Sequence, residues 1–171
     1  MRVLGIDPGL RVTGYAVLDC DDALAGRRRI DPALVEAGFV RLRQGDPVAD
    51  RLVELERDLT AVVERLRPTH ACVEKLFAHY KRPVTAAIMG HGRGVALLVC
   101  RRAGLELMEL NATEVKRAVV GAGHASKEQV QRAVQAQFRL AEPPNPPDVA
   151  DAIAIAAAAA RRLALAANDA V

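Results

Sequence analysis

Apolar and polar residues at the start of the chain follow the pattern of β-strands. Residues 3–18 are mainly apolar, and Pro8 and Gly9 divide them into two strands joined by a tight turn. Asp7 stands where the first of these strands ends. Residues 34–42 resume the strand pattern after a charged stretch, so an antiparallel three-strand meander is the simplest arrangement.

Helix and strand patterns alternate in the middle of the chain. Apolar residues recur at helical spacing between residues 47 and 68, with a proline at each end. A short apolar strand at residues 70–74 ends in Glu74. A second helix is predicted at residues 85–103 and a further strand at residues 105–110.

The last third of the chain is predicted to be helical. Thr113 is the expected cap of a short helix, and a second helix covers residues 126–138. A proline-rich connector at residues 142–147 precedes a final helix that begins near Asp148. This order of elements favours an α/β fold, with a mixed β-sheet and helices on both faces.

Carboxylates occur at positions that such a sheet brings together. Asp7 and Glu74 end strands expected to be neighbours, and Asp148 and Asp151 lie three residues apart at a helix start. Clustered carboxylates repel one another unless cations lie between them, and oxygen ligands suit Mg²⁺. Two such ions, roughly 4 Å apart, are the arrangement that promotes phosphodiester hydrolysis. Taken alone, Asp7 also fits a turn or cap and Glu74 a sheet edge. Asp148 and Asp151 are ordinary first-turn residues of a helix, so only the combination favours a metal site.

Aromatic and basic residues alternate where the apolar pattern fails, at residues 76–84. This stretch holds Phe77, Tyr80, Lys81 and Arg82, in a chain with only 3% aromatic residues. Its composition indicates a contact surface for nucleic acid, in which an exposed aromatic ring stacks on a base. A core position at the strand end is equally compatible with Phe77. The net charge of +3 adds weak support for an acidic partner.

Composition excludes several other classes of protein. The chain has 171 residues, 51% of them hydrophobic, which predicts a single globular domain over residues 1–171. Cys20, Cys72 and Cys100 are widely spaced and odd in number, which is typical of reduced thiols in a cytoplasmic protein. We expect no signal peptide and no membrane span, because the longest apolar run, residues 152–160, is too short.

Further motifs follow one another along the chain: Gly5-Ile6-Asp7-Pro8-Gly9-Leu10, Val73-Glu74-Lys75-Leu76-Phe77, Gly90-His91-Gly92-Arg93-Gly94-Val95, Val115-Lys116-Arg117-Ala118-Val119-Val120-Gly121 and Asp148-Val149-Ala150-Asp151-Ala152. Together they resemble, in order and spacing, the signatures of the RuvC family of bacterial Holliday junction resolvases. The likeness covers nearly the whole chain.

The resemblance implies a ribonuclease H-like fold, a homodimer and a nuclease that uses Mg²⁺, with Mn²⁺ as a substitute. Its substrate would be the four-way DNA junction of homologous recombination and repair, cut by paired symmetric nicks that leave 5′-phosphate and 3′-hydroxyl ends. RuvA and RuvB, the branch-migration proteins, are the partners it implies. Glycines at 90, 92 and 94 would let their helix pack closely, either in the dimer interface or within the subunit.

The resemblance also assigns roles to residues. Asp7, Glu74, Asp148 and Asp151 become the catalytic metal ligands. Lys116 and Lys127 would lie near the scissile phosphate, and Phe77 would stack at the junction centre. DNA contact by Tyr80, Lys81 and Arg82 rests on composition alone.

Two other functions remain open from the residues. The Asp-Pro-Gly turn also begins the phosphate-binding hairpins of actin-like ATPases and sugar kinases, although 171 residues leave no room for their second lobe. A junction-binding module without activity is the third possibility, but all four acidic positions are filled.

Overall fold

The computed structural model describes residues 1–20, 31–75 and 83–169. Within them, strands form one sheet in the order β3-β2-β1-β4-β5. The strands are β1 (Arg2–Asp7), β2 (Val12–Asp19), β3 (Ala33–Arg41), β4 (His70–Glu74) and β5 (Glu106–Leu110). β1, β2 and β3 are antiparallel neighbours, whereas β1, β4 and β5 run parallel. The predicted meander and the mixed sheet are therefore confirmed.

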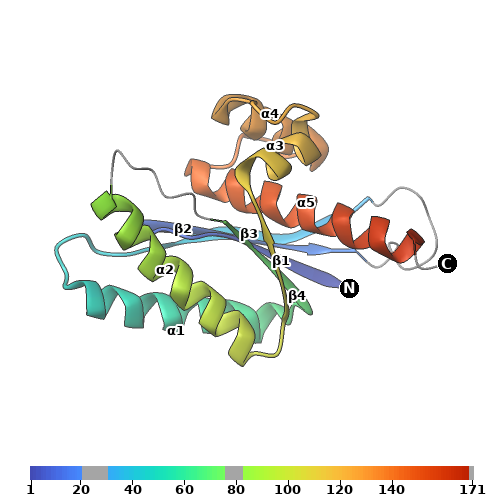
Figure 1. Cartoon of the computed structure of the whole chain (residues 1–171). Helices are drawn as coiled ribbons and strands as arrows, with labels where there is room; N and C mark the ends of the chain where they lie inside the picture. The colour runs from blue at the N-terminus through green and yellow to red at the C-terminus, as the bar shows by residue number, and fades with distance from the viewer. Residues whose placement is uncertain (21–30, 76–82, 170–171) are drawn as a thin grey trace.

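Helices cover both faces of the sheet, as predicted (Figure 1). α1 (Val48–Leu66) and α2 (Pro83–Arg102) pack on one face. α5 (Pro147–Asp169) lies on the other, with α3 (Ala112–Val120) and α4 (Lys127–Gln137) beyond it. β1 separates two cores because successive side chains point to opposite faces: Leu4 packs with α1, and Val3 packs with α5.

Glycines in the sheet let α5 approach unusually closely. A Cβ atom at Gly5 would overlap the carbonyl oxygen of Ala152, and one at Gly14 would overlap that of Asp148. Gly14 is also the cross-strand partner of Asp7. The first turn of α5 therefore lies directly against the strand end that carries Asp7.

The start of α3 differs from the prediction. Asn111, not Thr113, is the N-cap: its side chain accepts a hydrogen bond from the Glu114 main-chain N–H at 2.9 Å. The Glu114 carboxylate accepts one in return from the Asn111 N–H at 2.8 Å. This reciprocal capping box requires an acceptor three residues before a glutamate, a spacing that Asn111 satisfies and Thr113 does not.

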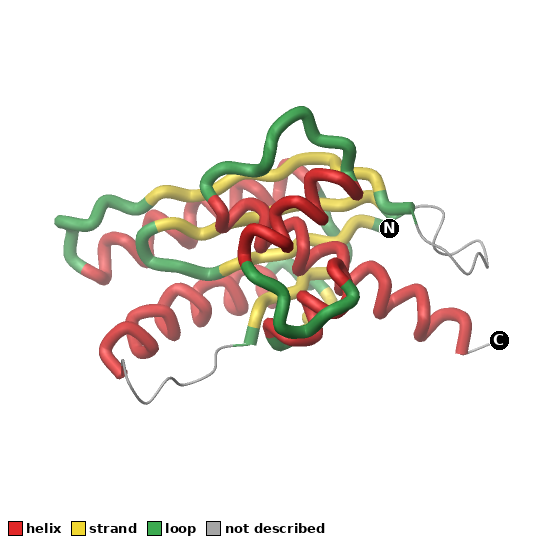
Figure 2. Tube along the Cα trace, turned by 90° about the horizontal axis from the view of Figure 1, so that it is seen from above, coloured by secondary structure: helices red, strands yellow, loops and turns green. Residues whose placement is uncertain are grey.

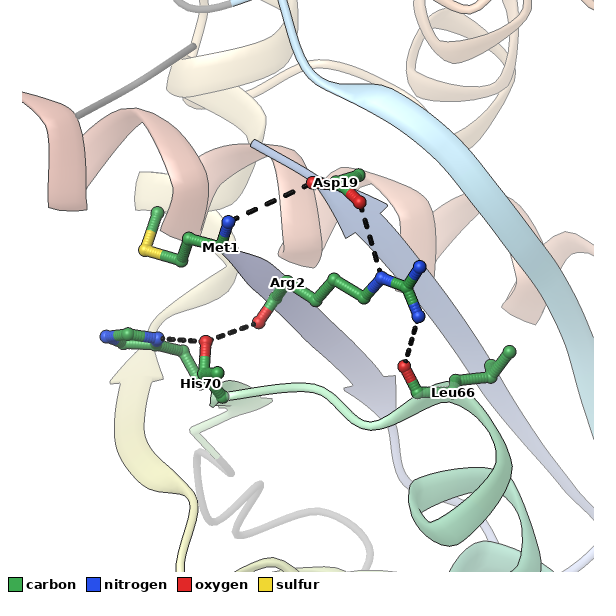
Figure 3. Close-up of polar contacts among 6 residues, drawn as sticks. Met1, Arg2, Asp19, Leu66 and His70 are labelled. Carbon is green, nitrogen blue, oxygen red and sulfur yellow. Dashed lines mark hydrogen bonds and ion pairs between the residues drawn. The ribbon is translucent and has the colours of Figure 1, made fainter. Parts of the chain in front are cut away.

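Polar contacts fix the end of the sheet opposite Asp7 (Figure 3). Arg2 donates from Nη1 to the carbonyl oxygen of Leu66 at 2.7 Å, and its Nε lies 3.3 Å from Asp19 Oδ2. Thr69 Oγ1 donates to the carbonyl oxygen of Arg2 at 3.1 Å. These contacts join the start of β1 to the ends of α1 and β2. Figure 2 shows the N-terminus and the last turns of α5 toward this same end.

All three cysteines are buried thiols without disulfides, as expected. Burial raises the pKa of Cys72 and of Cys100 to about 12, so both thiols stay protonated and unreactive near neutral pH. In the described part of the chain, no helix combines the length and the apolar character needed to cross a membrane.

Candidate active site

The acidic residues come from three elements that meet at one end of the sheet. Ile6 pairs with Val73 in the parallel β1–β4 ladder, so Asp7 and Glu74 follow at the same end of neighbouring strands. Asp148 and Asp151 belong to the first turns of α5, which Gly14 allows to lie against this end.

The turn after Asp7 is held by a buried threonine. Thr13 donates from Oγ1 to the Gly9 carbonyl oxygen at 2.6 Å and accepts from the Gly9 N–H at 3.1 Å. These bonds fold the chain back within a few residues. The backbone therefore turns away from Asp7, whose residue is half-buried beside the turn.

Electrostatic repulsion links Asp7 to the three other acids. Burial raises the pKa of Asp7 to about 8, and repulsion from Asp151, Glu74 and Asp148 adds to this shift, whereas Lys127 opposes it. Burial also raises the pKa of Glu74, and Asp151 is its next largest cause. The pKa of Asp151 is raised by burial, against the lowering effect of Lys127. A cluster of this kind favours a bound cation.

Both predicted lysines lie beside the carboxylates. Lys127 is the first residue of α4, and its Nζ lies 3.5 Å from Asp151 Oδ2. Asp151 raises the pKa of Lys127 more than any other cause. Lys116, on α3, lowers the pKa of Glu74 and Asp151 by a smaller electrostatic effect than Lys127. The carboxylates thus have two cations near them on the side of α3 and α4.

Comparison with known proteins identifies the family. The family model described as "Crossover junction endodeoxyribonuclease RuvC" matches residues 3–159. The chain belongs to the RuvC family. It is a crossover junction endodeoxyribonuclease, as its motifs predict.

Relatives and solved structures support this over most of the chain. The RuvC proteins of Pelotomaculum thermopropionicum and Moorella thermoacetica are 42% and 44% identical to it, over 91% of this chain and 90% and 89% of theirs. Thermus thermophilus RuvC in complex with a Holliday junction substrate superimposes with a TM-score of 0.85 at 30% identity, covering 98% of this chain and 97% of that one. The predicted ribonuclease H-like fold is confirmed.

The donor atoms of this RuvC site suit hard divalent cations. All four acids offer carboxylate oxygens. Among the described residues, no three His, Cys, Asp or Glu side chains form a ready-made coordination set. Mg²⁺ commonly takes only one or two carboxylates and completes its shell with water and substrate phosphate oxygens, so the residues present fit such an ion.

One residue of the site was not assigned from sequence. Arg93 on α2 donates from Nε to the carbonyl oxygen of Glu74 at 3.0 Å, and its Nη2 forms an ion pair with Glu109. It lies within the RuvC motif of residues 90–95. A single arginine between glycines on a helix that faces the sheet was the available signal.

The glycines of α2 differ in their surroundings. Gly92 faces inward, where a Cβ atom would lie 3.5 Å from the carbonyl group of Gly9. Gly90 and Gly94 have open space around them among the described residues. A Cβ atom at Gly92 would therefore make only ordinary van der Waals contact, so internal packing does not require any of the three glycines. The predicted DNA contacts of Phe77, Tyr80, Lys81 and Arg82 lie outside the described residues.

Proposed function

We propose that this RuvC enzyme resolves four-way DNA junctions by hydrolysing one phosphodiester in each of two symmetrically placed strands. The products are 5′-phosphate and 3′-hydroxyl ends that a ligase can join. The observation that carries the proposal is the convergence of Asp7, Glu74, Asp148 and Asp151 at one end of the sheet, beside Lys116 and Lys127.

The four carboxylates are proposed to hold two divalent ions, Mg²⁺ in the cell and Mn²⁺ as a substitute. Such ions, when bound, lower the pKa of an attacking water and stabilise the departing 3′ oxygen. The raised pKa values of Asp7, Glu74 and Asp151 support this assignment, because burial and mutual repulsion leave the carboxylates in need of positive charge.

The lysines are proposed to act on the DNA phosphate. A phosphodiester over the carboxylates is repelled by them, and cationic groups beside the site offset that repulsion. Lys127 is 72% exposed, so it can reach a bound strand while staying near Asp151. Charge that builds on the phosphate during displacement is stabilised by Lys127 and Lys116 in the same way.

A homodimer is proposed because paired cuts need two identical sites, which twofold symmetry provides. The outward face of α2 is the candidate interface. Val84 and Leu98 are 71% and 45% exposed, and Gly90 and Gly94 between them present open backbone at helical spacing. We further propose that residues 1–171 act as one domain, since the site draws residues from both ends of the chain. The enzyme is proposed to act in the cytoplasm, with RuvA and RuvB as partners.

Nicking of a synthetic four-way junction tests the proposal. Symmetric, ligatable nicks are expected with Mg²⁺ and not with EDTA, and a linear duplex should stay uncut. Asp7→Asn should abolish cutting while junction binding remains. Binding without any cutting by the unmodified chain would indicate a binding module instead, and ATP turnover without nicking would indicate a phosphotransferase.

A further inference from the structure

A cavity beside the carboxylates is lined by a buried arginine. It has a volume of about 650 Å³ and lies between the β1–β2 turn and the starts of α1 and α2. Its walls include Gly9, Arg11, Arg51, Met89 and Asp148. Because Asp148 belongs both to this cavity and to the acidic cluster, the cavity adjoins the active site. We propose that it binds a second backbone phosphate of the DNA strand that is cut.

Arg51 carries the proposal. Only 8% of this residue is exposed, and its Nε makes no hydrogen bond within the described part of the chain. No described carboxylate forms an ion pair with it either. A guanidinium group keeps its charge at any physiological pH, and a buried N–H donor without an acceptor is unfavourable. An anion in the cavity would remove that penalty, and a phosphate matches the forked donors of arginine.

The position of Arg51 on α1 makes the arginine unexpected on packing grounds. Leu55 and Leu59 follow it at successive turns on the buried face of the helix, where both are fully buried. A leucine at position 51 would continue this stripe without burying a charge. Packing therefore gives no reason for the arginine, whereas ligand binding does.

Other arginines line this cavity and a hollow that adjoins it. Arg11 is exposed, and with the Gln44 amide oxygen turned toward it, that oxygen accepts from Arg11 Nε at 2.6 Å and Nη2 at 2.8 Å. Gln44 is neutral, so this pairing holds Arg11 in place and leaves its charge available. A second hollow of about 430 Å³ shares Arg11 and Gln44 and adds Arg41 and Arg43, with Glu54 as the acid in its wall.

A DNA strand fits this charge distribution. A single small anion would need only Arg51, whereas a strand leaving the active site would also meet Arg11 and Arg41, which line the adjoining hollow. Leu10, Ile88 and Met89 give the first cavity an apolar wall against which deoxyribose can pack. The inference rests on the proposed function, because it takes the ligand to be part of the DNA bound over the carboxylates.

Junction affinity over a range of salt concentrations tests the inference. The background is Asp7→Asn, which is not expected to cut, and Arg51→Gln is added to it. We expect a 5- to 20-fold weaker junction affinity and a log–log salt slope smaller by about 1, the change for one lost phosphate contact. Arg57→Gln is the matched control, since Arg57 lies on the same helix, is 69% exposed and pairs with Asp58. It should change neither value.

Neutral linkages locate the contact. Junctions that carry one methylphosphonate at each position around the cut are compared in both backgrounds. At one position the neutral linkage should weaken junction binding to the Asp7→Asn variant. The same linkage should not weaken binding to the Asp7→Asn, Arg51→Gln double variant. Arg51→Gln alone should leave Tm unchanged or raise it, because it removes a buried donor that has no acceptor.

Several results would overturn the inference. The first is an Arg51→Gln variant whose junction affinity and salt slope are unchanged. The second is a loss of affinity without a position-specific methylphosphonate effect. The third is a loss of dimer mass, which would make the cavity part of a subunit contact. If Asp7→Asn itself does not prefer a four-way junction over a linear duplex, the proposed function fails separately. The effect of Arg51→Gln on duplex affinity then still decides whether Arg51 contacts phosphate.

Discussion

Arg93 holds Glu74 through the main chain: its Nε donates to the carbonyl oxygen of Glu74 at 3.0 Å. The same guanidinium pairs with Glu109 at the end of β5, so α2 is tied to the ends of two parallel strands. The residue does not act on the carboxylate directly. It fixes the strand end from which that carboxylate projects, and α2 also carries the face proposed for dimerisation.

Replacing Arg93 by Gln should therefore slow cutting more than it weakens binding. Groups that orient a metal ligand are typically worth 10- to 100-fold, so we expect about that loss in the single-turnover rate at saturating enzyme. Junction affinity should change less than threefold by comparison. Arg101→Gln, at the exposed end of the same helix, is the control. An equal loss of affinity and rate would contradict a positioning role.

Gly14 sets the distance between α5 and the end of β1. Because a Cβ atom there would overlap the carbonyl oxygen of Asp148, Gly14→Ala should displace the first turn of α5. Overpacking of this kind costs about 1–3 kcal/mol, and the displaced carboxylates should lower the cleavage rate by more than tenfold. Gly45→Ala, which meets nothing within 4 Å, should leave both quantities unchanged. Denaturant unfolding and single-turnover cleavage measure the two effects, and full activity in Gly14→Ala would refute the close-approach explanation.

The sequence predicted the site where the residue type at a position has a single physical explanation. A carboxylate at each of two neighbouring strand ends and a pair at a helix start predicted the acidic cluster, because sheet topology places those positions together. The contact between Arg93 and Glu74 could not be predicted in this way. It depends on how α2 lies across the sheet, which periodicity does not determine.

Local competition explains the error at α3. Asn111 and Thr113 are both good N-caps, and the choice depends on which has a glutamate three residues later. For Arg51 the position was clear from the sequence, one turn before Leu55, but its role was not. The sequence shows an arginine on the apolar face of the helix. Only the structure shows that its Nε is buried without a hydrogen-bond partner, which is the basis of the phosphate-binding hypothesis.

Lys127 should matter for the rate of the reaction. Its ammonium group lies 3.5 Å from Asp151 and lowers the pKa values of Asp7, Glu74 and Asp151. We expect Lys127→Ala to cut about 10- to 100-fold more slowly, in the range of other single electrostatic contacts to a reacting phosphate. Arg132→Gln, on the exposed side of α4, should cut normally. A similar rate for Lys127→Ala and Arg132→Gln would exclude a direct role.

The pKa of Asp7 makes the stability of the metal-free protein depend on pH. Folding raises that pKa from 3.8 to about 8, so between these values the folded state binds a proton that the unfolded state has released. Asp7 therefore destabilises the fold increasingly as pH rises from 4 to 8, with the opposite sign to a salt-bridged acid. Unfolding in EDTA should show Asp7→Asn to be more stable than the parent at pH 8, by up to about 5 kcal/mol for the full shift, and similar to the parent near pH 4. An identical pH dependence of stability in the two proteins would contradict the pKa shift. Asp58→Asn is a remote control that should keep the pH dependence of the parent.

Leu98 tests the proposed dimer face without disturbing the core. Its side chain is 45% exposed on α2, while Val99 and Cys100 beside it are buried, so a charge at position 98 meets solvent in a monomer and apolar surface in a dimer. Leu98→Asp should leave the far-ultraviolet circular dichroism spectrum unchanged, and it should halve the mass measured by light scattering at micromolar concentration. Nicks in the two strands should then appear independently instead of as a pair. Leu165→Asp, an equally apolar change at a 64% exposed position on α5, is the control. A dimer that survives Leu98→Asp and dissociates with Leu165→Asp would move the interface to the opposite face of the sheet.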